Sequence, residues 1–224
     1  MKFGVVVFPG SNCDRDMIEA LQNDLNQEVV VLWHKDRDIS MFDTNDCIVL
    51  PGGFSYGDYL RCGAIARFSP MMQSVTAFAE KGGKVLGVCN GFQILCESGL
   101  LPGVLLRNAG QQFVCKNVFL KSPAENDIDV LKIPVAHGEG RFYAASNVLD
   151  GIYKNNQVIY QYCDESGAFS DEANPNGAVN HIAGICNTGR NVFGMMPHPE
   201  RACSDLLNNN DGKKVFKALF GIGN

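Results

Sequence analysis

The segment 87–91, Gly-Val-Cys-Asn-Gly, carries the clearest chemical signature in this chain. It follows the apolar run 84–86 and precedes a helix-like stretch at 92–96. A cysteine with glycines two positions before and after it, where a strand turns into a helix, is the thiol counterpart of a nucleophile elbow. The small flanking residues permit a tight turn, and the N-terminus of the helix favours a thiolate. The pattern predicts that Cys89 is a nucleophile.

A nucleophilic cysteine needs a base, and the base needs an orienting group. Among the four histidines, His198 is the candidate, because it stands in Pro197-His198-Pro199-Glu200 directly after the apolar run 192–196. The two prolines hold the backbone extended. Side chains two positions apart in an extended segment point the same way, so Glu200 can fix the orientation of the imidazole.

An acyl-transfer site also needs donors for the oxyanion of the tetrahedral intermediate. The backbone N–H groups of Gly53, in the corner Pro51-Gly52-Gly53, and of Asn90 are the candidates. The same glycines also fit a plain strand-exit turn, and the two interpretations are compatible. Cys13 and Cys62 lie near glycine-containing turns as well, but neither stands between a buried strand and a helix, so we expect both to be structural.

These residues require a scaffold in which strands and helices alternate. Strands are predicted at 5–8, 28–33, 47–50 and 84–88, and helices at 14–25, 70–80 and from 90 to about 98. Such alternation implies a parallel sheet with right-handed crossovers. Ligands in such sheets bind beyond the carboxyl ends of the strands. The three glycine-containing turns after residues 8, 50 and 88 therefore converge on one cleft.

The second half of the chain has shorter strand-like runs, at 113–120, 133–136, 158–162, 182–186 and 192–196, followed by a helix at 213–220. The segment 187–191 predicts a hairpin turn. The expected fold is α/β, an open, mostly parallel sheet flanked by helices, with additional short antiparallel strands in the C-terminal half. Because the sequence shows no linker and no internal repeat, we expect a single domain over 1–224.

Composition excludes several classes of function. The net charge of −5 argues against nucleic acid or an anionic membrane as partner. No apolar run has membrane-spanning length, and the N-terminal run is too short for a signal peptide. The nine cysteines form no C-x-x-C pair, so we expect no metal site. Cysteines used as small buried hydrophobic residues indicate a reducing compartment, and we expect a cytoplasmic protein.

Taken together, the motifs resemble a known family. Three of them, in this order, resemble the triad-type class I glutamine amidotransferases: Pro51-Gly52-Gly53, the segment 87–93, and His198-Pro199-Glu200. Two longer stretches, 50–67 and 134–142, resemble the subfamily of glutaminase subunits of phosphoribosylformylglycinamidine synthases, in purine biosynthesis. The resemblance spans nearly the whole chain, without departure at the triad or the oxyanion corner. Because no synthetase region is present, it points to the stand-alone subunit.

The resemblance implies a role for each site residue. Cys89 attacks the side-chain amide carbon of L-glutamine, His198 passes a proton to the leaving ammonia, and Glu200 orients His198. Water then hydrolyses the glutamyl thioester to glutamate. Candidates for binding the substrate, each also explicable as an ordinary helix or loop residue, are Gln93, His137, Gly138, Glu139 and Gly140. Candidates for a partner interface are Tyr56, Asp58, Arg61 and Arg67, in a loop whose alternative explanation is an ordinary solvated loop.

The resemblance also implies a partner. The ammonia would pass to the large synthetase subunit, which makes formylglycinamidine ribonucleotide, and a small subunit can bridge the two. The chain has no G-x-x-x-x-G-K-[ST] phosphate loop. We therefore expect no cofactor in this chain, with ATP and Mg²⁺ bound by the synthetase.

Two other functions fit the residues. A Cys-His hydrolase on the same fold, such as a peptidase or a γ-glutamyl hydrolase, would use the same nucleophile and base. A non-catalytic regulatory module would keep the fold but is expected to lose part of the triad, and Cys89, His198 and Glu200 are all present. Labelling of Cys89 by a glutamine-like or a peptide-like electrophile distinguishes the two enzymes.

Overall fold

The computed structural model describes residues 1–123 and 129–223. Nine strands form one sheet in the order β2-β1-β3-β4-β11-β10-β9-β6-β7, and β5 and β8 form a separate pair. The strands are β1 Lys2–Val7, β2 Glu28–Trp33, β3 Cys47–Leu50, β4 Lys84–Val88, β5 Val104–Leu106, β6 Val114–Lys121, β7 Leu131–His137, β8 Arg141–Tyr143, β9 Val158–Cys163, β10 Ile182–Cys186 and β11 Val192–Met195.

The first half of the sheet is parallel. Strands β2, β1, β3, β4 and β11 run in the same direction, and β11 comes from the far end of the chain to lie beside β4. The central strands β3 and β11 are buried at every residue, as expected when helices cover both faces of a parallel sheet. The carboxyl ends of β4 and β11 therefore lie side by side, which brings the segments after Val88 and Met195 together.

The second half of the sheet is antiparallel. The hairpin after β10 returns the chain to β11, and β9, β6 and β7 continue the sheet by antiparallel pairing. Buried and more exposed residues alternate along β7, the pattern of a strand with one face on the core. Leu131, Ile133, Val135 and His137 occupy the buried face. This alternation places His137, the last residue of β7, on the inner side.

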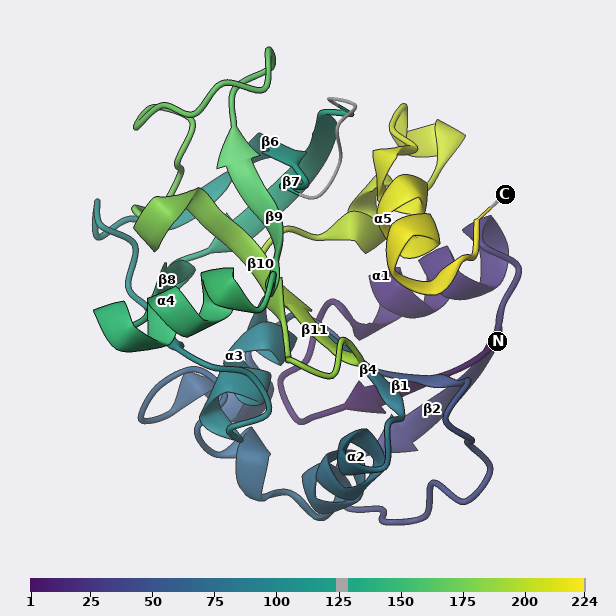
Figure 1. The fold of residues 1–224 in the computed structure, drawn as a ribbon. Helices are drawn as coiled ribbons and strands as arrows, with labels where there is room; N and C mark the ends of the chain where they lie inside the picture. Colours follow the sequence, from purple (N-terminus) through teal and green to yellow (C-terminus); the bar gives the residue numbers. More distant parts are fainter. Residues whose placement is uncertain (124–128, 224) are drawn as a thin grey trace.

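The described residues form five α-helices: α1 Asp14–Glu19, α2 Pro70–Glu80, α3 Asn90–Glu97, α4 Ser146–Lys154 and α5 Asp211–Phe220. Helix α1 continues as a π-helical turn over Ala20–Asp24. In Figure 1, α1 and α5 lie on one side of the sheet and α2 and α3 on the other. The hydroxyl of Ser69 caps α2 by accepting the N–H of Met72. Helix α3 starts directly after Cys89.

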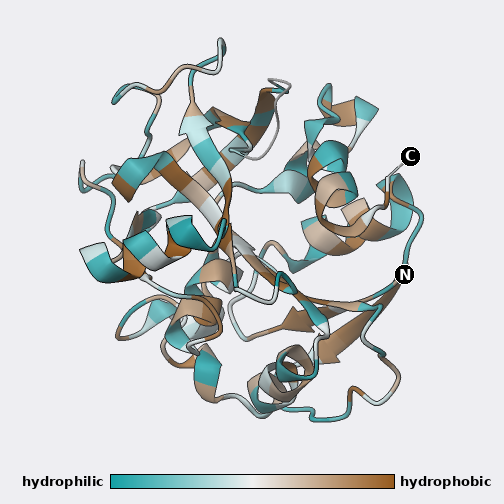
Figure 2. Cartoon of the chain, in the orientation of Figure 1, coloured by the Kyte–Doolittle hydropathy of each residue, from teal (hydrophilic) through white to brown (hydrophobic). Residues whose placement is uncertain are grey.

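Hydrophobic residues are concentrated in the central strands, whereas the loops are mostly hydrophilic (Figure 2). One continuous core includes residues from both halves of the sheet. Among the described residues, no helix combines the length and the apolar character needed to cross a bilayer. Within the same ranges, no group of three or more His, Cys, Asp and Glu side chains is placed to hold a metal ion.

The predicted fold class is confirmed, and the predicted strands 28–33, 47–50, 84–88 and 182–186 and the helix 70–80 have the observed bounds. Three elements were not predicted: the short strands β5 and β8 and the helix α4. Helix α4 has apolar residues at helical spacing, Val148, Leu149 and Ile152, although only Ile152 is fully buried. A single domain over 1–224 stays a prediction.

Candidate active site

Cys89 stands at the junction of β4 and α3 in an unusual backbone conformation, with φ 51° and ψ −104°. Few non-glycine residues adopt positive φ, and such strain persists only where the surroundings fix it. Here the N–H of Cys89 donates to the carbonyl of Met195 at 2.8 Å, which ties the turn to the end of β11. The structure therefore places the sulfur at the N-terminus of α3, as predicted for a nucleophile elbow.

The two flanking glycines are required by close backbone approaches. A Cβ atom on Gly91 would lie 1.8 Å from the carbonyl oxygen of Leu50, at the end of β3. A Cβ atom on Gly87 would lie 2.6 Å from the backbone of Gly91. Helix α3 therefore packs against β3 and β4 at a distance that only glycine permits. This close packing fixes the position of Cys89.

His198 and Glu200 form a buried pair after β11. The Nδ1 atom of His198 lies 2.6 Å from Oε1 of Glu200, and their exposed fractions are 1% and 3%. Burial by itself lowers the pKa of His198, but the charges of Glu200 and Cys89 outweigh burial and raise it. The Nε2 atom has no hydrogen-bond partner among the described residues. The pair thus favours an imidazolium with one ring nitrogen free to exchange a proton.

Cys89 and His198 line the same cavity, of about 130 Å³. Its other lining residues are Asn12, Cys13, Gly53, Phe54, Asp58, Cys62, Gln93, Phe113, Ala136, His137, Gly138, Glu139 and Arg201. A second hollow of about 360 Å³ adjoins it and shares Phe54, Asp58, Cys62, Phe113, Gly138 and Glu139. We call these the inner and the outer cavity. Cys89 and His198 line only the inner one.

The predicted oxyanion corner borders the inner cavity. Gly53 has φ +132°, and a Cβ atom there would lie 2.7 Å from the amide nitrogen of Asn12. The neighbouring Gly52 also packs closely, because a Cβ atom on it would lie 2.7 Å from Cε1 of His198. As the first residue of α3, Asn90 has an N–H with no acceptor inside the helix. The oxyanion role of Gly53 and Asn90 stays a prediction.

The side chain of Asn90 ties α3 to the loop after β3. Its Oδ1 accepts the N–H of Ser55 at 3.2 Å, and its Nδ2 donates to Gln93 at 2.9 Å and to Asp58 at 3.2 Å. Gln93 in turn donates from Nε2 to the carbonyl of Glu139 at 2.6 Å. Gln93 is therefore a buried residue that lines the inner cavity, not an exposed helix residue. Its contact with substrate stays a prediction.

The loop 137–140 is held by two asparagines that sequence reasoning missed. Asn108 accepts from Nδ1 of His137 at 3.1 Å and from the N–H of Gly140 at 3.0 Å, and it donates to the carbonyl of His137 at 2.9 Å. Asn176 donates to the carbonyl of Gly140 at 2.8 Å. Both asparagines are buried. Neither stands in a recognisable motif, and their partners are about 30 residues away, so no local pattern indicates them.

His137 lines the inner cavity together with Cys89 and His198. Burial and the nearby His198 lower the pKa of His137 to about 4, so its ring is neutral. Because Asn108 accepts from Nδ1, the proton sits on that nitrogen and Nε2 is an acceptor. This Nε2 atom is buried without a partner among the described residues, and His137 lines the inner cavity. A Cβ atom on Gly140 would collide with the ring, so the glycine at 140 makes room for it.

The four predicted interface residues have partners within the chain. The hydroxyl of Tyr56 contacts Nδ1 of His34. Arg61 forms two hydrogen bonds, of 2.6 and 2.7 Å, with the Glu97 carboxylate at the C-terminal end of α3, and Arg67 donates to the Glu97 carbonyl at 2.9 Å. Asp58 lines both cavities. An interface role for these residues stays a prediction.

Cys13 and Cys62, which we expected to be structural, both line the inner cavity. Burial raises the pKa of Cys13 to about 12, even though Arg201 donates to its sulfur at 3.1 Å. Burial and the carboxylates of Asp58 and Glu139 raise the pKa of Cys62 as well. Both residues are therefore thiols at neutral pH and poor nucleophiles.

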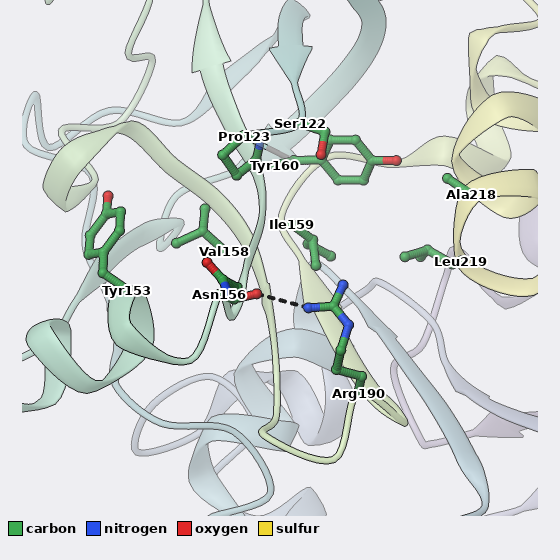
Figure 3. Close-up of a pocket in the computed structure, with 10 residues that line it drawn as sticks. All are labelled: Ser122, Pro123, Tyr153, Asn156, Val158, Ile159, Tyr160, Arg190, Ala218 and Leu219. Atoms are coloured by element: carbon green, nitrogen blue, oxygen red, sulfur yellow. Dashed lines mark hydrogen bonds between the residues drawn. The ribbon is translucent and has the colours of Figure 1, made fainter. Parts of the chain in front are cut away.

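A further cavity, of about 280 Å³, is lined by none of Cys89, His198 and Glu200. Figure 3 shows that its lining comes from β9, from α5 and from the segments around Ser122 and Tyr153. The guanidinium of Arg190 borders it and donates to the carbonyl of Asn156 at 2.9 Å. The cavity contains neither a cysteine nor a histidine, so it offers no nucleophile and no base of the kind found beside Cys89.

Comparison with known proteins agrees with this geometry. The family profile of the CobB/CobQ-like glutamine amidotransferase domain matches residues 1–219. The phosphoribosylformylglycinamidine synthase subunit PurQ of Salinibacter ruber is 52% identical over 97% of this chain and 95% of its own length. The PurQ subunit of Gloeobacter violaceus is 50% identical over 98% of this chain and 97% of its own length.

Solved structures give the same picture. A chain of the PurLQS structure from Thermotoga maritima superposes with a TM-score of 0.81 and 39% identity, over 98% of this chain and 97% of that one. A glutamine amidotransferase from Thermotoga maritima has a TM-score of 0.56 at 15% identity, over 97% of this chain and 83% of that one, and shows a shared fold only.

Proposed function

The chain belongs to the CobB/CobQ-like glutamine amidotransferase family, among the PurQ subunits of phosphoribosylformylglycinamidine synthase, and we propose that Cys89 carries out its glutaminase chemistry. The protein is the glutaminase subunit of an ATP-dependent ligase in purine biosynthesis, and its partner is the synthetase subunit. One observation carries the assignment of the nucleophile: the strained Cys89 turn opens into the same small cavity as the buried His198–Glu200 pair.

In the proposed mechanism, the thiolate of Cys89 attacks the side-chain amide carbon of L-glutamine. The electron pair of the carbonyl moves to oxygen, and the N–H groups of Gly53 and Asn90 stabilise the resulting oxyanion. The imidazolium of His198 then gives its Nε2 proton to the amide nitrogen, the carbon–nitrogen bond breaks, and ammonia leaves. A γ-glutamyl thioester on Cys89 remains.

Hydrolysis of the thioester uses the same residues, with His198 now acting as a base and Cys89 as the leaving group. Neutral His198 accepts a proton from water as the hydroxide attacks the thioester carbon, and the sulfur of Cys89 leaves as a thiolate. Glu200 supports the imidazolium that forms, because its carboxylate lies 2.6 Å from Nδ1. In substrate binding, Gln93 and the loop 137–140 contact the bound glutamine. Glutamate is the second product.

Ammonia must reach the synthetase unprotonated, which favours direct passage over release into water. We infer that glutamine hydrolysis is slow in the isolated chain and fast in the complex, to which a small bridging subunit can contribute. ATP and Mg²⁺ act in the synthetase, with no cofactor in this chain. The nine free thiols fit a reducing, cytoplasmic setting.

The test is to co-purify the chain with its synthetase and to measure glutamine turnover with and without the synthetase substrates. Labelling of Cys89 by 6-diazo-5-oxo-L-norleucine, read by peptide mass spectrometry, identifies the nucleophile, and Cys89→Ser is expected to abolish both labelling and turnover. Labelling by peptide electrophiles alone would favour a peptidase. Full activity of the isolated chain, without binding to the synthetase, would contradict the coupling.

A further inference from the structure

Two histidines line the inner cavity, and their Nδ1 atoms have different kinds of partner. His198 faces the carboxylate of Glu200 at 2.6 Å. His137 faces the side-chain amide of Asn108 at 3.1 Å. A carboxylate stabilises an imidazolium, whereas an amide oxygen carries no net charge with which to do so. The two rings therefore differ in charge because of their partners as well as because of burial.

The amide of Asn108 is fixed in one orientation by its backbone partners. Its Nδ2 donates to the carbonyls of Gln112 at 2.8 Å and His137 at 2.9 Å, which can only accept. Its Oδ1 accepts from the N–H of Gly140 at 3.0 Å, which can only donate. The remaining position of the amide is a lone pair of Oδ1, and it faces Nδ1 of His137. This nitrogen therefore has to carry a proton, and the neutral ring leaves Nε2 without one.

We propose that Asn108 is a positioning residue of the glutaminase reaction, which holds His137 as a neutral, Nδ1-protonated ring so that His198, and not His137, gives and takes the proton. Surroundings that push two titratable groups apart in this way divide the acid–base roles between them. A second imidazolium in the cavity would repel that of His198 and make it lose its proton at lower pH. The inference rests on the proposed glutaminase function. Asn108 lines neither cavity, so it acts through His137 and not on the substrate.

The surroundings of His137 agree with a neutral ring. Its Nε2 atom is buried without a hydrogen-bond partner among the described residues, so a proton placed there would find no acceptor. Burial and the charge of His198 lower the pKa of His137 to about 4. The titratable groups that line the same cavity are Cys13, Asp58, Cys62, Cys89, Glu139, His198 and Arg201. Neither carboxylate among them hydrogen-bonds to the His137 ring in the described part of the chain, and Glu139 is paired with Arg107 at 3.5 Å.

The competing explanation is that Asn108 only braces the loop 137–140. Asn108→Asp separates the two roles, because it gives His137 the kind of partner that His198 has, with little change of shape. If His137 takes up a proton in this variant, the new cation lines the cavity and lowers the pKa of both Cys89 and His198. If His137 stays neutral, the added negative charge raises both pKa values. The sign of the shift therefore distinguishes the two explanations.

We expect Asn108→Asp to lower the pH at which Cys89 reaches half of its maximal rate of alkylation by iodoacetamide by about one unit or more. The alkaline limit of glutamine turnover in the complex with the synthetase should fall with it. Asn176→Asp is the matched control, because Asn176 is also buried and holds the same loop through Gly140, with no histidine among its hydrogen-bond partners in the described residues. It should lower neither pH value. Peptide mass spectrometry of the Cys89 peptide excludes contributions from the other eight thiols.

NMR of the ¹⁵N-labelled histidine rings tests the unmodified chain directly, even if Asn108→Asp does not fold. Protonated and unprotonated ring nitrogens differ in chemical shift, and His137→Gln identifies the signals of His137. We expect a protonated Nδ1 and an unprotonated Nε2 between about pH 5.5 and 8, where an ordinary histidine changes its charge. An imidazolium or an Nε2-protonated ring in this range, or an upward or absent shift in Asn108→Asp, would overturn the proposal. Labelling of unmodified Cys89 by 6-diazo-5-oxo-L-norleucine tests the glutaminase function separately, so either can fail while the other result stands.

Discussion

At the scale of single residues, the site depends on Cys89, whose backbone adopts a sparsely populated conformation. The φ of 51° and ψ of −104° at Cys89 cost on the order of 1–3 kcal/mol. The hydrogen bond to Met195 and the close packing of Gly91 on Leu50 impose this conformation. The strain is therefore a property of the surrounding fold, and it remains when the sulfur is removed.

The strain at Cys89 predicts an unusual order of stability for two variants at this position. At most positions glycine is less stable than alanine by about 0.5–1 kcal/mol. At position 89 we expect the reverse, because glycine adopts the observed backbone conformation without strain and alanine does not. Urea denaturation of Cys89→Gly and Cys89→Ala measures the difference, which should favour glycine by about 1 kcal/mol. A more stable alanine variant would show that position 89 is not strained.

His137 gives a pH-dependent contribution to stability whose sign can be worked out. Its pKa is about 4 in the folded protein, because burial and His198 disfavour the charged ring, and about 6.5 in the unfolded chain. Between these values the unfolded state binds a proton that the folded state does not. The contribution of His137 to the free energy of unfolding is therefore fully present above pH 6.5. It falls by up to about 3 kcal/mol as the pH drops to 4.

We expect His137→Gln to flatten the dependence of the unfolding free energy on pH in this window by about one proton. Urea denaturation at several pH values gives the slope, and comparing slopes removes any uniform loss of stability in the variant. The raised pKa of His198 acts at alkaline pH and lies outside the window. The same slope in both proteins would mean that His137 takes up its proton equally in the folded and unfolded states.

At the scale of elements, the parts that position the nucleophile are those that the sequence predicts best. The strands before Cys89 and His198 are short apolar runs bounded by turns, and each has the burial expected from its pattern. The strands β5 and β8 were not predicted, because they have three residues each and are held by pairing with each other across the chain. Helix α4 was missed although its apolar residues stand at helical spacing. Local patterns reveal an element where its own residues face the core.

Two glycines in helices provide a matched test of element packing. Gly91 in α3 leaves no room for a Cβ atom, which would lie 1.8 Å from the carbonyl oxygen of Leu50. Gly151 in α4 has no neighbour within 4 Å of such an atom. We expect Gly91→Ala to destabilise the protein by about 3 kcal/mol or more and Gly151→Ala to stabilise it by about 0.5–1 kcal/mol. Thermal or urea unfolding measures both, and a well-tolerated Gly91→Ala would refute the close packing of α3.

At the scale of the whole molecule, the inner cavity combines segments from most of the chain. Sequence motifs indicate Cys89, His198 and Gly53, because each stands in a turn with its own local pattern. They do not indicate Asn108 or Arg107, because the contacts of these residues with His137 and Glu139 form only when the fold brings the segments after β5 and β7 together. The same holds for Asp58, which the motif places in a loop and the fold places at the meeting point of two cavities.

The surface around the outer cavity also has the features of a docking surface. The loop after β3 has positive φ at Tyr56, Asp58 and Leu60, and it exposes Tyr59 and Leu60 to solvent. Phe54 and Phe113 are exposed at the cavity lining as well. Clustered exposed apolar side chains on a protein surface mark interaction sites. Because this loop also holds Asn90 and Glu97 at the two ends of α3, a partner bound here can act on the Cys89 turn.

We therefore expect Leu60→Asp to weaken assembly with the synthetase and to lower its stimulation of glutamine hydrolysis about tenfold or more. Labelling of Cys89 by iodoacetamide in the isolated chain should be unchanged, since Leu60 is 92% exposed and lines neither cavity. Leu206→Asp is the control, because Leu206 is 93% exposed but lies in the turn Asp205–Leu207, outside both cavities. Gel filtration of the complex and glutamine turnover measure the two effects. If Leu60→Asp assembles and is stimulated like the unmodified protein, the loop after β3 is not where the synthetase binds.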